Sequence, residues 1–151
     1  MIEEQHGLKK VFNAAVKHAS DPVFRADKTW EGQAAITGPY VYGTALRKGE
    51  TFRLWYQVLN QSNHVGYAES RDGVARRKPE LGIIEFQGSK ANKVVVSTFQ
   101  PDAAGGGHRH NPGVIQRPRE TDVQKRYALY GFDGRVSHAR VAFSPDSWHW
   151  T

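Results

Sequence analysis

The chain has 151 residues, a formal net charge of +6 and no cysteine. A hydrophobic fraction of 38% with 11% aromatic residues excludes a disordered chain, and the lack of an 18-residue apolar run excludes a membrane-spanning helix. The missing cysteines exclude disulfides, thiolate metal sites and cysteine nucleophiles. The positive charge is scattered, which indicates a solvated surface and no nucleic-acid partner.

A short helix is predicted at the N-terminus, over residues 3–18. Four apolar residues recur there at i, i+3, i+4 and i+7, which places them on one helical face: Leu8, Val11, Phe12 and Ala15. Ser20-Asp21-Pro22 ends this helix, because the residue before a proline is pushed out of the α region.

Beyond this segment the pattern is that of antiparallel strands. Short stretches rich in aromatic and β-branched residues alternate with polar turns, which is typical of an all-β fold. The predicted strands cover residues 40–46, 51–58, 64–70, 113–116, 126–131 and 135–144. Residues 100–112 hold three consecutive glycines and two prolines, and we predict a loop there.

An internal repeat is the strongest pattern in the sequence. Residues 52–56 correspond to 126–130, and residues 67–73 correspond to 141–147, both at an offset of 74 and without a gap. A repeated meander of this size favours stacked or radial β units such as propeller blades; the alternative is two similar hairpins in an ordinary sandwich. Each copy ends in a Ser-x-Asp turn, and we expect Asp72 and Asp146 to bond backbone N–H groups two or three residues on.

Several motifs, in this order, resemble the N-terminal part of bacterial proteins similar to glycoside hydrolase families 32 and 43. The most specific piece is the run from Lys78 to Asn92. The other pieces are Asp21 to Glu31, Phe52 to Tyr56, Tyr67 to Gly73, Asn111-Pro112 and Ala142 to Asp146.

The resemblance implies a five-bladed propeller with a sugar site at its axis. The expected fold is therefore an all-β partial β-propeller of about two antiparallel blades with a short N-terminal helix. We expect a lead segment over residues 1–20 and a glycosidase-like propeller domain over 21–151. The second repeat stops at Trp150-Thr151, so the expectation is a domain that is truncated at its C-terminal end.

The same resemblance implies catalytic carboxylates from the inner strands of different blades. Asp27 is the expected first-blade carboxylate, with Glu31 and Asp21 as rivals. No second-blade carboxylate is assigned, because Arg117-Pro118 stands where relatives often carry Asp-Pro. The general acid is expected beyond residue 151. Sugar binding is expected at three further residues: Trp30, His110 and Asn111.

Two functions follow from this pattern. The first is a glycoside hydrolase-like protein whose catalytic set is incomplete in this chain, and the alternative is a non-catalytic carbohydrate-binding module. No cofactor is expected. His108 and His110 could form a metal pair, but no third ligand lies at motif spacing, so no metal site is predicted. Open sheet edges lead us to expect self-association.

Overall fold

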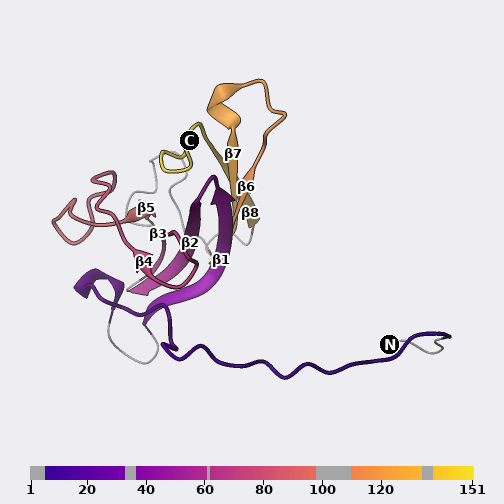
Figure 1. Ribbon diagram of the computed structural model, residues 1–151. Helices are drawn as coiled ribbons and strands as arrows, with labels where there is room; N and C mark the ends of the chain where they lie inside the picture. Colours follow the sequence, from indigo (N-terminus) through magenta and orange to yellow (C-terminus); the bar gives the residue numbers. More distant parts are fainter. Residues whose placement is uncertain (1–5, 33–36, 61, 98–109, 134–137) are drawn as a thin grey trace.

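The computed structural model describes residues 6–32, 37–60, 62–97, 110–133 and 138–151. Over these residues the protein consists of two antiparallel sheets (Figure 1). The helical structure in the described part is limited to two single-turn 3-10 helices, η1 (Thr29–Glu31) and η2 (Val123–Lys125). The predicted all-β class is confirmed.

The first sheet is a meander with the strand order β1-β2-β3-β4. The fifth strand, β5, also pairs with β3. Its strands are β1 (Gly38–Lys48), β2 (Thr51–Asn60), β3 (Ser62–Ser70), β4 (Arg76–Arg77) and β5 (Val94–Val96). The three long strands lie where the aromatic and β-branched stretches predicted them.

The second sheet has the order β6-β7-β8 and lies beside the first (Figure 1). Its strands are β6 (His110–Gln116), β7 (Tyr127–Asp133) and β8 (His138–Ser144). The N–H of Val114 on β6 donates to Thr44 Oγ1 on β1 at 2.9 Å, so the first strands of the two meanders are in contact. The two sheets do not close into a ring, and a propeller is therefore not confirmed.

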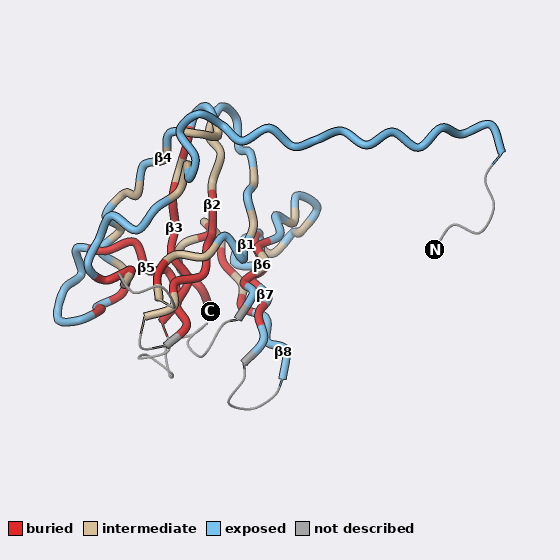
Figure 2. The backbone as a smooth tube through the Cα atoms, turned by 90° about the horizontal axis from the view of Figure 1, so that it is seen from below, coloured by how far each residue is buried: buried red, intermediate tan, exposed pale blue. Residues whose placement is uncertain are grey.

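The predicted N-terminal helix is wrong. Residues 6–20 contain no helix, and the segment runs away from the sheets with each of its residues exposed (Figure 2). Phe12, on the supposed helical face, is 83% exposed. An isolated helix of about 15 residues is marginal in water, and this apolar face has no described surface to pack against.

Two hydrophobic clusters hold the fold together, one on each face of β2. The cluster between the sheets is formed mainly by Trp55, Val65, Tyr67, Val114, Tyr127, Leu129, Ala142 and Trp150. The cluster on the outer face of the first sheet is formed by Trp30, Leu54, Tyr56, Val58, Ala68, Ile84, Phe86 and Val94. Because successive strand residues point to opposite faces, Trp55 and Tyr56 belong to different cores.

The two Ser-x-Asp turns have the predicted geometry. Asp72 Oδ1 accepts the N–H groups two and three residues further on, both at 2.8 Å. Asp146 Oδ1 accepts the equivalent pair at 2.8 and 2.9 Å. In each turn the preceding serine hydroxyl donates to the aspartate, at 2.9 Å from Ser70 and 3.0 Å from Ser144. Both turns therefore stabilise the backbone, as expected.

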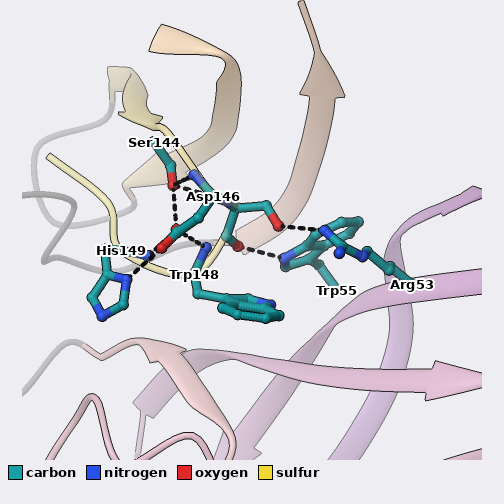
Figure 3. A network of polar contacts seen from close by, with 7 residues as sticks. Arg53, Trp55, Ser144, Asp146, Trp148 and His149 are labelled. Carbon is teal, nitrogen blue, oxygen red and sulfur yellow. Dashed lines mark hydrogen bonds and ion pairs between the residues drawn. The ribbon is translucent and has the colours of Figure 1, made fainter. Parts of the chain in front are cut away.

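The second turn also connects the two sheets (Figure 3). Trp55 Nε1 on β2 donates to the carbonyl oxygen of Ser147 at 3.0 Å, and Arg53 Nη1 lies 3.4 Å from Ser147 Oγ. Ser147 has a φ of 78°, close to the 80° of Gly73 at the same place in the first turn. Contacts to β2 thus hold a non-glycine residue in the left-handed region.

The offset of 74 holds through the turns but not through the strand pairing. Arg77 pairs with Glu69, and Thr151 makes two backbone hydrogen bonds with Phe143, so the return segment recurs at 74. Within the hairpins, however, Phe52 pairs with Ser70, whereas Ser144 pairs with residue 127. The motifs thus recur at 74 along the sequence, while the cross-strand pairing of the two hairpins differs by one residue.

Candidate functional site

Asp27 and Glu31, the two predicted catalytic residues, lie together around one lysine. Lys78 Nζ is 2.8 Å from Asp27 Oδ1 and 2.7 and 2.8 Å from the two oxygens of Glu31. It also donates to the carbonyl oxygen of Arg25 at 2.7 Å. The lysine follows β4, whereas both acids flank or belong to η1. This lysine occupies the space between the two carboxylates, where a glycosidic bond would have to lie.

Glu31 is fully buried, and hydrogen bonds satisfy both of its carboxylate oxygens. Besides Lys78, the hydroxyl of Tyr56 donates to Oε1 at 2.8 Å and the N–H of Asp27 donates to Oε2 at 3.0 Å. Burial raises the pKa of Tyr56 well above its usual value, and the charge of Glu31 raises it further. Glu31 therefore acts as the acceptor of a buried network with no open side toward a substrate.

Asp27 is the more accessible of the two acids, with 58% of its side chain exposed. Partial burial alone would raise the pKa of Asp27, but the hydrogen bond and the charge of Lys78 outweigh it and lower the pKa. Its carboxylate thus stays ionised and cannot donate a proton as a general acid near neutral pH. The rival Asp21 is exposed and forms an ion pair with Lys17 at 3.7 Å.

Trp30, a predicted sugar-binding residue, lies in the outer core of the first sheet. It is only 6% exposed, and its ring packs edge-to-face on Phe86 with centroids 6.5 Å apart. Its carbonyl oxygen accepts from Asn60 Nδ2 at 2.8 Å. The ring is therefore covered by the protein, and a sugar could stack on it only after this core opened.

Asn111 lies in a separate pocket between the two sheets, with a volume of about 560 Å³. The lining residues come from β1 and β6: Tyr42, Gly43, Asn111, Pro112 and Gly113. Asn111 is exposed and has a φ of 52°, and its N–H donates to Gln57 Oε1 at 3.1 Å. Each of the two strands has an irregular register here, between residues 40 and 43 and between 110 and 113. These bulges open the strand edges around the pocket.

The predicted residues do not form one site. Glu31 contacts Tyr56 on one face of β2, whereas Asn111 contacts Gln57, whose side chain points to the other face because neighbours alternate. Sequence reasoning missed Lys78 and Tyr42. The two tyrosines at positions 40 and 42 of a predicted strand were a usable signal for Tyr42, but no local pattern ties Lys78 to acids about 50 residues earlier.

The remaining predictions concern metals and membranes. His108 lies outside the described residues, and only the backbone of His110 is described, where it pairs with Phe132. Within the described ranges no group of three or more histidine, aspartate or glutamate residues is arranged to hold a metal ion. No helix in that part of the chain is long and apolar enough to cross a membrane.

Comparison with known proteins gives one remote likeness. No family model matches the chain, and no curated protein matches it. Among solved structures, a protein from Bacteroides ovatus described as a "putative glycoside hydrolase" is similar with a TM-score of 0.47 and 21% identity over 76% of this chain. The match spans 30% of that protein's length.

Proposed function

We propose that this chain is a carbohydrate-binding part of a glycoside hydrolase-like protein, and that a neutral sugar binds in the pocket of Tyr42 and Asn111. The observation that carries the proposal is an exposed aromatic ring next to an exposed amide in a pocket without a charged lining residue. Ligand pockets combine apolar and aromatic walls with a few placed polar groups, and a sugar presents both C–H faces and hydroxyls to such walls.

The ring of Tyr42 suits this role. It is 57% exposed and stacks on Tyr40 with centroids 6.0 Å apart and an angle of 23° between the planes. The stacked neighbour limits the motion of the ring, so less side-chain entropy is lost when a sugar covers it. The two pocket glycines, Gly43 and Gly113, carry no side chain and leave room beside it.

The state of the carboxylates supports sugar binding without hydrolysis. Hydrolysis needs an acid for the leaving oxygen and a carboxylate on the other face of the sugar. Glu31 is buried and fully bonded, Asp27 is held ionised by Lys78, and neither lines the Tyr42 pocket. A parent glycosidase would have to supply its acid from other residues.

A binding titration tests the proposal. Calorimetry with a panel of neutral oligosaccharides built from xylose, arabinose, fructose or galactose should give binding to at least one of them. Tyr42→Ala should then weaken it about 10-fold or more, since a stacked aromatic contributes roughly 1 kcal/mol beyond its buried area. Tyr130→Ala is the matched control, because Tyr130 is 47% exposed on the second sheet and does not line the pocket. Equal losses in both variants, or no binding to the panel, would refute the site.

We also propose that the two meanders are consecutive blades of a propeller and that the chain self-associates. The contact between the first strands of the two meanders supports the blades. Exposed apolar side chains on the second sheet support self-association: Ile115, Tyr130, Phe132 and Val141. Sedimentation velocity at rising concentration tests the latter, and a single monomer peak throughout would contradict it.

A further inference from the structure

A second pocket, of about 200 Å³, lies beside Asp27 on the other side of β2 from the Tyr42 site. Its lining has four charged and three apolar residues: Arg25, Asp27, Arg76 and Lys78, and Pro22, Val23 and Phe24. This volume is below the roughly 300 Å³ of the smallest drug-sized sites, so it fits one small ring and no oligosaccharide.

The charges around this pocket do not cancel. Three cations, Arg25, Arg76 and Lys78, face the single lining carboxylate of Asp27. Behind the lysine, Glu31 supplies one further negative charge. The group as a whole keeps one positive charge in excess. Because Lys78 already bonds both carboxylates, the excess resides on the two guanidinium groups.

The two arginines are placed by the backbone. Arg76 Nη2 donates to the carbonyl oxygen of Gly73 at 2.9 Å, while its Nη1 is buried without a hydrogen-bond partner among the described residues. Arg25 Nε donates to the carbonyl oxygen of Pro22 at 3.1 Å. Arg25 is exposed, and a guanidinium is suited to the planar, bidentate recognition of a carboxylate.

The apolar lining residues indicate what kind of molecule would carry the bound carboxylate. Phe24 is packed edge-to-face against Tyr56 with centroids 4.7 Å apart, and Lys78 Nζ lies 4.6 Å from its ring centroid. Phe24, Pro22 and Val23 together form an apolar wall, on which the C–H face of a sugar ring could pack. We propose that this pocket binds a monoanionic sugar, a hexuronate, with its carboxylate on Arg25 and Arg76. This site is separate from the Tyr42 pocket and does not depend on it.

Titration of the full chain with glucuronate, followed by NMR or calorimetry, tests the site. Glucose is the neutral match, and acetate and phosphate test small anions. Glucuronate should bind at least 10-fold more tightly than glucose, and rising salt should weaken it because exposed charges are screened. Arg25→Gln and Arg76→Gln should each weaken it about 10-fold, while Asp27→Asn, which removes the opposing charge, should strengthen it several-fold.

Arg119→Gln is the control, because Arg119 is exposed and does not line the pocket. Arg25 is also exposed, so its variant stays informative even if Arg76→Gln fails to fold. Equal affinity for glucose and glucuronate, equal losses in Arg25→Gln and Arg119→Gln, or acetate binding as tightly as glucuronate would overturn the proposal. None of these outcomes depends on Tyr42→Ala, which tests the other pocket.

Discussion

Lys78 is the residue on which the predicted acid pair depends. Its side chain is 5% exposed and that of Glu31 is fully buried. Removal of one partner of a buried ion pair leaves an uncompensated charge and costs about 3–5 kcal/mol. Lys78→Met should therefore lower the free energy of unfolding, measured by urea denaturation, by about that amount.

The neighbouring Arg77 provides the control for this variant. Arg77 Nη2 lies 2.7 Å from Glu69 Oε2, but its side chain is 75% exposed. Exposed ion pairs contribute about 0–1 kcal/mol, so Arg77→Met should change little. Similar losses in the two variants would show that Lys78 and Glu31 are not a buried pair.

Because the pKa of Asp146 is lowered in the folded chain, we expect the free energy of unfolding to decrease in acid. Partial burial would raise its pKa, but the N–H and ring of His149, with the N–H of Trp148, lower it from 3.8 to about 2. The unfolded chain therefore binds the proton first, and the contribution is complete above pH 3.8 and is lost as the pH falls toward 2. We expect about 1 kcal/mol after allowance for solvent screening.

Urea titrations between pH 2 and pH 5 measure this contribution. Asp146→Asn removes the titrating group, so its unfolding free energy should fall less steeply over this range than that of the native chain. Parallel curves for the two proteins would show that the turn at Asp146 does not carry the effect.

Single residues of the site were only partly predictable from sequence. Asp27 and Glu31 lie four residues apart, and their proximity follows from the local chain. The contact of Glu31 with Tyr56, and the burial of Trp30, depend on how η1 packs on β2. No short pattern encodes that packing, because a tryptophan beside two acids fits a core and a sugar site equally well.

At the scale of elements, each meander contains a glycine next to its first-strand bulge, and the two differ in what surrounds them. A Cβ on Gly43 would lie 1.8 Å from the carbonyl oxygen of Trp55, whereas Gly113 has no atom within 4 Å of such a Cβ. Gly43→Ala must push the β1 backbone off β2, and overpacking of this kind costs about 3 kcal/mol or more.

The glycine pair makes a matched test of strand contact. Thermal melts should show a large decrease in Tm for Gly43→Ala and almost no change for Gly113→Ala. An unchanged Tm in Gly43→Ala would mean that β1 and β2 do not approach as closely as described.

Strand positions and turns were predictable because alternation and turn residues are local signals. The N-terminal helix failed because periodicity shows which face would be apolar but not whether a partner surface exists. The one-residue difference in strand pairing between the two hairpins could not be predicted for a related reason. The turns repeat in sequence, but cross-strand pairing is set by packing, and only the core residues of both sheets fix it.

At the scale of the molecule, the second turn connects the two sheets through the hydrogen bond from Trp55 to Ser147. The carboxylates of Asp27 and Glu31 do not line the pocket between β1 and β6. Aryl xyloside, arabinofuranoside, fructoside and galactoside should therefore show no hydrolysis by the purified chain. Turnover that disappears in Asp27→Asn would show that the catalytic set is complete in these residues and that binding alone is the wrong account.

NMR can locate a neutral sugar bound between β1 and β6. Titration of an isotope-labelled chain with the sugar that binds in calorimetry should shift the backbone amides of the pocket most strongly, those of Tyr42, Gly43, Asn111 and Gly113. We predict that the amides around Asp27 and Lys78 stay in place during this titration. Shifts concentrated at Asp27 and Lys78, or spread without a maximum between β1 and β6, would show that the sugar does not bind in the Tyr42 pocket.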